Sequence, residues 1–128
     1  MTVNKNMRIL VVDDFKTMVK IIENLLRQMG FTTIEEASNG QAALAKIKAQ
    51  KYDLILSDWN MEPMSGMELL KAVRADPANK NIPVILVTAE SKPENIAAAR
   101  QAGVNDYIIK PFNAATLKEK LIATLGSF

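Results

Sequence analysis

Runs of apolar residues alternate with segments of helical period along this chain, and this alternation limits the possible folds more than any other feature. Arg8–Val12, Leu54–Leu56 and Pro83–Val87 are rich in apolar residues and lack a polar residue at every second position. Such runs are typical of strands that helices cover on both faces of a parallel sheet. Asp106–Ile109 is a shorter run of this kind. Thr32–Ala37 is more polar, so we expect it to form a strand near an edge of the sheet.

A segment of helical period follows each predicted strand. Phe15–Met29 carries apolar residues at the spacing of a stripe that faces the core, and Gly30 is expected to end this helix. Repeated strand–helix pairs predict an α/β fold, with a parallel sheet between two layers of helices. The other predicted helices are Gln41–Gln50, a helix through Leu69, Leu70 and Val73, a helix from Pro93 to Ala102, and a helix that begins at Ala114.

The composition excludes several common kinds of active site. The chain has 128 residues, which suits one domain over residues 1–128, with residues 1–6 expected to be flexible. It contains no cysteine and no histidine, which rules out disulfides, cysteine nucleophiles, serine–histidine triads and most zinc sites. A net charge of +2 without a basic cluster argues against nucleic acid, and no apolar run approaches the ~20 residues that cross a bilayer. We therefore expect a soluble, cytoplasmic protein.

Reactive side chains stand where most of the predicted strands end. They are Asp13 and Asp14, Asp58, Thr88 and Lys110. The carboxyl ends of parallel strands lie along one edge of a sheet, and open α/β sheets bind their ligands at that edge. We therefore expect three carboxylates, a hydroxyl and an ammonium group to meet there.

The three carboxylates predict a Mg²⁺ site. Carboxylates that are brought together repel one another, and a set of oxygen ligands suits Mg²⁺. With Lys110 and Thr88 at neighbouring strand ends, Asp58 is a candidate nucleophile that attacks phosphorus to form an aspartyl phosphate. Two simpler interpretations stay open at this point: Asp14 caps the following helix, and Asp58 accepts hydrogen bonds in a turn.

Four short motifs together resemble the receiver domain of two-component response regulators. The motifs are Val11–Phe15, Ser57–Met61, Val87–Glu90 and Lys110–Phe112. The resemblance extends from Arg8 to about Leu125. It implies a flavodoxin-like (βα)5 fold, which is a three-layer sandwich whose five-stranded parallel sheet has the strand order 2-1-3-4-5.

The resemblance also implies roles for the residues at the strand ends. Asp58 resembles the phosphoacceptor, and Lys110 resembles the lysine that contacts the phosphoryl group. Asp13, Asp14 and Asp58 resemble the acidic residues that bind Mg²⁺, with the backbone carbonyl of Asn60 as a further ligand. A domain of this family is a signalling protein rather than an enzyme, although it assists its own phosphotransfer and dephosphorylation.

Thr88 and Tyr107 resemble the hydroxyl and the aromatic side chain that change position together when such a domain is phosphorylated. The exposed face between the fourth helix and the fifth strand would then change its affinity for a partner. The segment after Pro93 is rich in alanine. This composition is consistent with a shallowly packed, movable helix, and close packing of a helix on a sheet explains it equally well.

The loop after Asp58 departs from the family pattern. Asn60 and Glu90 occupy positions that tune hydrolysis of the acyl phosphate in this family. Where the family usually has Met-Pro-x-Met-Asp-Gly, this chain has Met-Glu-Pro-Met-Ser-Gly at Met61–Gly66. Glu62 adds a carboxylate near the site, so we expect it to change metal affinity or phosphoryl lifetime. The sequence does not determine whether the bond from Lys110 to the following proline is cis or trans.

Protein partners follow from the same resemblance. A histidine kinase would donate the phosphoryl group, and a phosphatase is a further candidate partner. Because the chain ends with the fifth predicted helix, we expect its output to be protein binding. We also expect a monomer. The match of Asp58–Met61 and Tyr107 favours the flagellar motor switch protein as the target, in chemotaxis. A single-domain phosphorelay intermediate or a phosphate sink for the kinase is the alternative within the family.

Two other classes of protein fit the residues less well. A haloacid-dehalogenase-like hydrolase also forms an aspartyl phosphate, but it needs a second aspartate two residues after the nucleophile, where this chain has Asn60. A flavodoxin-like flavin binder holds phosphate in a loop rich in glycine, serine and threonine after the first strand. This chain has Asp13 and Asp14 there, and their charges would repel phosphate unless a cation intervened.

Overall fold

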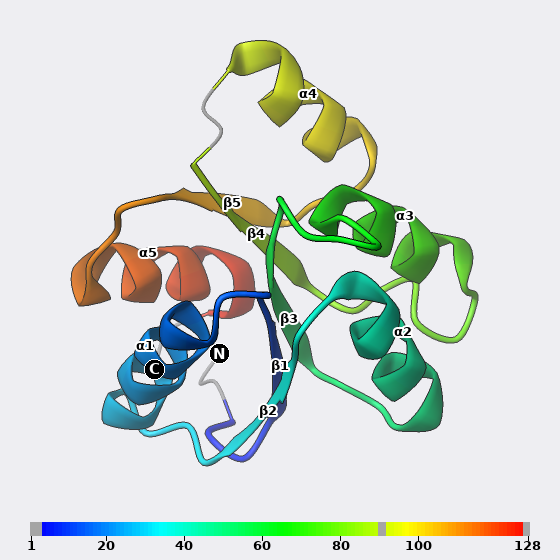
Figure 1. Ribbon diagram of the computed structural model, residues 1–128. Coiled ribbons are helices and arrows are strands. Elements are labelled where there is room, and N and C mark those ends of the chain that lie inside the picture. Colours follow the sequence, from blue (N-terminus) through cyan, green and yellow to red (C-terminus); the bar gives the residue numbers. More distant parts are fainter. Residues whose placement is uncertain (1–3, 90–91, 127–128) are drawn as a thin grey trace.

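The computed structural model, which describes residues 4–89 and 92–126, contains one five-stranded parallel sheet (Figure 1). Its strand order is β2-β1-β3-β4-β5, so the predicted α/β fold and the predicted order 2-1-3-4-5 are both confirmed. The strands are β1 (Arg8–Val12), β2 (Thr33–Ala37), β3 (Leu54–Asp58), β4 (Val84–Thr88) and β5 (Asp106–Ile109).

A helix follows each strand, close to the predicted bounds. Asn39 and Asn113 each accept a hydrogen bond from the backbone N–H three residues ahead, which fixes where the second and fifth helices begin. Gly30 has a φ of 101°, a conformation that glycine adopts without strain, and it ends the first helix as predicted. The helices are α1 (Lys16–Gln28), α2 (Gly40–Ala49), α3 (Gly66–Ala75), α4 (Pro93–Gln101) and α5 (Ala114–Leu125).

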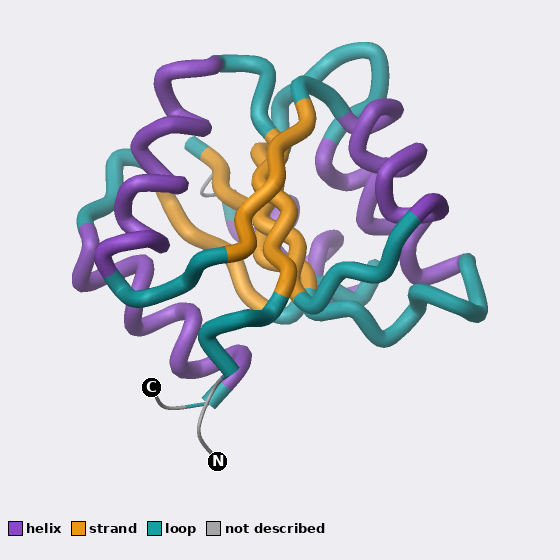
Figure 2. Tube along the Cα trace, turned by 90° about the horizontal axis from the view of Figure 1, so that it is seen from below, coloured by secondary structure: helices purple, strands orange, loops and turns teal. Residues whose placement is uncertain are grey.

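The helices form two layers around the sheet (Figures 1 and 2). α1 and α5 pack on one face through residues such as Ile22 and Leu117, while α2, α3 and α4 pack on the other through residues such as Ile47 and Leu70. Every residue of β3 and β4 is buried, which explains why their sequences show no alternation. β2 lies at the edge of the sheet and is mostly half-exposed, as its polar sequence predicted.

α4 packs shallowly against the rest of the domain. Ala99 is fully buried, whereas the neighbouring Ala97 and Ala98 are exposed. In Figure 1 the helix stands at the top of the molecule, beyond α3. Of the two explanations for its alanines, the structure therefore favours a helix held by few contacts over a helix packed closely on the sheet.

The first described residues lie against the body of the domain. The Lys5 backbone oxygen accepts a hydrogen bond from the Thr32 N–H, and the Lys5 ammonium lies 5.1 Å from the centre of the Phe31 ring. The expectation of a flexible N-terminus concerned residues 1–6, of which residues 1–3 lie outside the described part of the chain. Across the residues that the structure describes, no helix has both the length and the apolar character needed to cross a membrane.

Candidate functional site

Backbone hydrogen bonds between neighbouring strands fix the residues at the carboxyl edge of the sheet. The Asp13 N–H donates to the Ala37 carbonyl oxygen at 3.2 Å, which holds the first residue beyond β1 against β2. The Lys110 N–H donates to the Thr88 carbonyl oxygen at 2.8 Å, which holds the first residue beyond β5 against β4. The Trp59 N–H donates to the Val87 carbonyl oxygen at 3.2 Å, which holds the end of β3 against β4. Since β3 also pairs with β1, the strand ends that carry the site are held in register.

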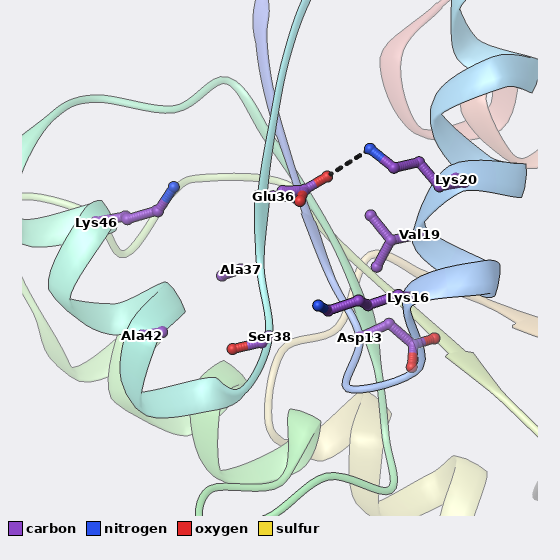
Figure 3. A pocket seen from close by; sticks show the side chains of 9 residues that line it. All are labelled: Asp13, Lys16, Val19, Lys20, Glu36, Ala37, Ser38, Ala42 and Lys46. Atoms are coloured by element: carbon purple, nitrogen blue, oxygen red, sulfur yellow. Dashed lines mark ion pairs between the residues drawn. The ribbon is translucent and has the colours of Figure 1, made fainter.

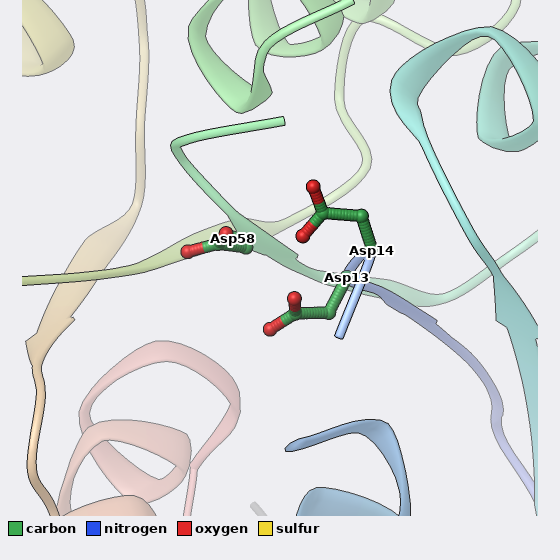
Figure 4. A group of neighbouring side chains, drawn as sticks. All are labelled: Asp13, Asp14 and Asp58. Atoms are coloured by element: carbon green, nitrogen blue, oxygen red, sulfur yellow. The ribbon is translucent and has the colours of Figure 1, made fainter. Parts of the chain in front are cut away.

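Asp13, Asp14 and Asp58 form an acidic cluster at this edge, as predicted. One carboxylate oxygen from each residue lies within 4.8 Å of those of the other two. Figure 4 shows Asp13 and Asp14 on the segment that follows β1, with their side chains directed toward Asp58 at the end of β3. Asp13 and Asp58 are buried, with 2% and 6% of their surfaces exposed, whereas Asp14 is exposed. The cluster is therefore open to solvent on the side of Asp14.

The carboxylate of Asp13 lies in an environment that disfavours negative charge. Burial raises its pKa above the usual value, and the charge of Asp58 raises it further, although a hydrogen bond from the Phe15 backbone N–H opposes the shift. That hydrogen bond, of 2.9 Å, goes to Oδ1. The other oxygen, Oδ2, is buried and accepts no hydrogen bond from any described residue. A buried carboxylate oxygen without a donor is the position that a cation would occupy.

Lys110 brings one positive charge to the cluster. Its Nζ lies 3.0 Å from Asp58 Oδ1, where it donates a hydrogen bond, and 3.7 Å from Asp13 Oδ2. The Lys110–Pro111 peptide bond is cis. One ammonium group does not balance three carboxylates, and the remaining ligands are all oxygen atoms. The cluster therefore has the charge and the donor atoms that suit Mg²⁺.

Replacing Asp13 by asparagine is expected to stabilise the metal-free protein and to weaken its response to Mg²⁺. Because the folded-state pKa of Asp13 is raised, the folded protein binds more protons than the unfolded chain as pH rises from about 4 through the folded-state pKa. Stability is therefore lost over that interval. An amide removes the cost of burying a negative charge. At pH 7 in EDTA, we therefore expect the free energy of unfolding measured with urea to be about 1 kcal/mol higher in the variant than in the parent.

Thermal unfolding with and without Mg²⁺ provides the second measurement for this variant. The parent protein should gain stability from Mg²⁺, and Asp13→Asn should gain much less. Asp14→Asn is the matched control in EDTA, because the Asp14 carboxylate is exposed and its removal should change stability less. Lower stability of Asp13→Asn than of the parent in EDTA would contradict this account of the buried charge.

Thr88 and Tyr107, the predicted switch pair, lie on neighbouring strands and on the same face of the sheet. Thr88 is fully buried at the end of β4. Leu86 pairs with Tyr107 and Thr88 pairs with Ile109, and side chains of paired and alternate residues point to the same face. The half-exposed Tyr107 ring lies between two cations, with Arg100 Cζ of α4 5.4 Å and Lys120 Nζ of α5 5.2 Å from its centre. Movement of this ring would therefore change contacts with both α4 and α5.

The loop after Asp58 is closed at its base by Gly66. The Gly66 N–H donates to the Trp59 carbonyl oxygen at 2.9 Å, and a Cβ on Gly66 would lie 2.1 Å from the Asp58 carbonyl oxygen. Only glycine allows this close approach. Asn60 and Glu62 are exposed and line one pocket with Asp14, and the Glu62–Pro63 bond is cis.

The residues predicted to tune dephosphorylation are thus described in part. Asn60 and Glu62 lie in the loop beside the acidic cluster, close enough to line a pocket with one of its members. Glu90 lies outside the described residues. Sequence reasoning missed the backbone N–H of Phe15, which holds Asp13, because no side-chain pattern marks it. Sequence reasoning also missed the lysines of a second pocket near Asp13. The spacing of Lys16 and Lys20, four residues apart on one helix, indicates that they share a helix face and could have pointed to this pocket.

The sequence matches a family model described as the response regulator receiver domain, over residues 9–122. The chain belongs to the response regulator receiver family. This receiver domain is 56% identical to the chemotaxis protein CheY-3 of Vibrio cholerae over 118 residues, which cover 92% of this chain and 91% of that protein. It is 53% identical to the chemotaxis protein CheY of Pseudomonas aeruginosa over 115 residues, covering 90% of this chain and 93% of that protein.

Solved structures of receiver domains have the same fold. The receiver domain superimposes on the chemotaxis protein CheY4 of Vibrio cholerae with a TM-score of 0.87, at 34% identity, over 94% of this chain and 99% of that one. The receiver domain of a sensor histidine kinase from Pseudomonas aeruginosa gives a TM-score of 0.85, at 31% identity, over 95% of this chain and 99% of that one. That structure is described with a magnesium ion coordinated in its active-site cleft. The resemblance drawn from the four motifs is therefore confirmed.

Proposed function

We propose that this receiver domain accepts a phosphoryl group on Asp58 from a histidine kinase and signals in chemotaxis by binding a protein partner when it is phosphorylated. The observation that carries the proposal is the position of Asp58, which is buried among two further carboxylates with the Lys110 ammonium 3.0 Å from its Oδ1. The high identity to chemotaxis proteins supports the proposed pathway.

In the proposed reaction, a carboxylate oxygen of Asp58 attacks the phosphorus of the phosphohistidine. A new P–O bond forms to Asp58 while the P–N bond to the donor breaks, and the donor imidazole leaves with the electron pair. Phosphoryl transfer depends mainly on positioning and on neutralisation of charge. Lys110 supplies one positive charge beside Asp58, and β3 with the loop base at Gly66 holds the carboxylate in place.

Mg²⁺ is the proposed cofactor. Asp13, Asp14, Asp58 and the backbone carbonyl of Asn60 would hold it, and when bound it would supply further positive charge toward the phosphoryl oxygens. The buried Oδ2 atom of Asp13, which accepts no hydrogen bond from the described residues, supports a cation at this place. The related receiver domain with a magnesium ion in its active-site cleft supports the choice of metal.

The proposed output is a change on the α4–β5–α5 side of the domain. Phosphorylation would draw the Thr88 hydroxyl toward the phosphoryl group, and Tyr107 would move toward the space that Thr88 leaves. Because Arg100 and Lys120 both contact the Tyr107 ring, this movement would alter the surface formed by α4 and α5. We place the flagellar motor switch protein at that surface, with the receiver domain acting as a cytoplasmic monomer. Asn60, Glu62 and Glu90 would set how fast the acyl phosphate is hydrolysed.

Acetyl phosphate with Mg²⁺ tests the proposal directly. Intact mass should increase by one phosphoryl group, and fluorescence of Trp59, the only tryptophan in the chain, should change in parallel. Omission of Mg²⁺ should prevent both changes. Failure to take up a phosphoryl group from either acetyl phosphate or a phosphorylated histidine kinase would overturn the proposal.

A Thr88→Ala variant separates phosphorylation from its output. We expect the variant to take up the phosphoryl group, because Asp58 and Lys110 remain in place, but to lose the phosphorylation-dependent increase in affinity for a motor-switch peptide. Thr88→Ser keeps the hydroxyl and should retain much of the increase. Fluorescence anisotropy of a labelled peptide measures both variants. Normal phosphorylation-dependent binding by Thr88→Ala would eliminate the proposed switch.

A further inference from the structure

A second pocket, which Asp13 also lines, lies where α1 and α2 flank the end of β2. Its volume is about 460 Å³, within the range of about 300–1,000 Å³ that is typical of sites for small molecules. It lies at the edge of the sheet, where β2 has a strand partner on one side only.

Figure 3 shows Lys16 and Lys20 extending from α1 and Lys46 extending from α2 on the opposite side of β2. The pocket is thus lined by side chains from three separate elements. Its lining residues are Asp13, Lys16, Val19, Lys20, Glu36, Ala37, Ser38, Ala42 and Lys46.

The three lysines of this pocket differ in how their charges are balanced. Lys20 Nζ lies 3.6 Å from a carboxylate oxygen of Glu36 and 3.8 Å from one of Glu23. Lys16 and Lys46 form no ion pair with any residue of the described chain. Lys46 is also half-buried, so part of its hydration is already lost. Lys16 therefore faces the pocket without an ion-pair partner among the described residues, whereas nearby glutamates partly balance Lys46, whose charge lowers the pKa of Glu35 and of Glu36.

The acidic residues of the pocket balance its three lysines only in part. Glu36 is engaged by Lys20, and the carboxylate of Asp13 takes part in the cluster with Asp14 and Asp58. The lining of the pocket therefore has three ammonium groups and two carboxylates. Ser38, which is exposed at the end of β2, adds a hydroxyl group that can donate a hydrogen bond to an anion.

Part of the pocket lining is apolar. Val19 of α1, Ala37 of β2 and Ala42 of α2 form this part, and the first two are buried. An inorganic ion would leave this surface uncovered. A ligand with an apolar body would cover it and gain hydrophobic contact, while its charged group reached the lysines.

We propose that this pocket binds a small organic anion that carries two negative charges on one group and an apolar body, such as a phosphate monoester. Lys16 and Lys46 contact the charged group, Ser38 donates a hydrogen bond to it, and Val19, Ala37 and Ala42 contact the body. This site adjoins the acidic cluster through Asp13 but does not use Asp58, and the inference stands or falls independently of the proposed phosphorylation.

Phenyl phosphate in EDTA is the probe that tests the site. Without a metal the acidic cluster repels anions, so binding under these conditions reports on the lysine pocket. In ¹H–¹⁵N correlation spectra, a phenyl phosphate titration should shift the amide signals of Ala37, Ser38 and Ala42 in a saturable way. Inorganic phosphate, which lacks the apolar body, and phenol, which lacks the charge, should each bind more weakly.

A pair of double variants identifies the lysines responsible. Lys16→Gln/Lys46→Gln should weaken phenyl phosphate binding by at least about fivefold, since it removes two charged contacts. Lys48→Gln/Lys51→Gln makes the same change of net charge at two exposed lysines outside the pocket, and it should bind as the parent does. Circular dichroism verifies that both variants are folded. Equal weakening in both pairs, shifts outside the pocket, or no saturable shift in the parent would each overturn the proposal.

Discussion

Replacing Asp58 by asparagine is expected to abolish phosphoryl uptake from acetyl phosphate in the presence of Mg²⁺. The amide preserves the size of the side chain, but it lacks the carboxylate oxygen that attacks phosphorus. The nearby carboxylates of Asp13 and Asp14 do not replace it, because neither is held against the Lys110 ammonium as closely as Asp58 is. Intact mass spectrometry should therefore detect an added phosphoryl group on the parent protein and none on the variant.

Asp53→Asn is the matched control for this experiment. It makes the same chemical change at an exposed aspartate, at the opposite end of β3 from Asp58. This variant should be phosphorylated at the parental rate. If Asp58→Asn took up as much phosphoryl group as the parent, the acceptor would be another residue, and our assignment of the site would be wrong.

Replacing Lys110 by glutamine should have two opposite effects. The ammonium group lies 3.0 Å from Asp58 Oδ1, so its loss removes positive charge from beside the transferring phosphoryl group. Removal of one such electrostatic contact typically slows a reaction by about 10²-fold, and we expect phosphorylation at saturating Mg²⁺ to slow to that extent. The same change leaves three carboxylates without a competing cation, so Mg²⁺ should bind more tightly.

A time course of intact mass measures the first effect, and titration of Trp59 fluorescence with Mg²⁺ measures the second. Lys48→Gln removes a charge from an exposed position on α2 and should change neither. Lys110→Arg keeps the charge and should recover part of the rate if charge is the important property. A parental rate in Lys110→Gln, or weaker Mg²⁺ binding, would contradict the role assigned to Lys110.

Much of the fold and the site was predictable because both depend on local patterns. Buried parallel strands require continuous apolar residues, and β3 and β4 have them. Once the strands were located, the topology of a parallel sheet placed Asp13, Asp58 and Lys110 at one edge without knowledge of any contact between them. The polar composition of β2 indicated its edge position in the same way.

Features that depend on the meeting of distant segments could not be predicted. The meeting of Lys46 with Lys16 in one pocket depends on how α2 lies relative to α1 and β2, and lysines are common on exposed helix faces. Whether α4 packs shallowly or closely depends on its distance from the sheet, and the alanines in its sequence do not determine that distance. Similarly, the sequence predicted a loop from Asp58 to Gly66 but not the close packing of Gly66 on the Asp58 carbonyl oxygen, which leaves no room for a Cβ.

The contact at Gly66 separates the position of Asp58 from the residues of the loop that follows it. Because Gly66 and Trp59 are joined by a hydrogen bond at the base of the loop, residues 60–65 project from a fixed frame. Asn60 and Glu62 can therefore be exchanged while Asp58 keeps its position. Under the proposed function, substitutions at these two positions would lengthen or shorten the lifetime of the acyl phosphate without rebuilding the rest of the domain.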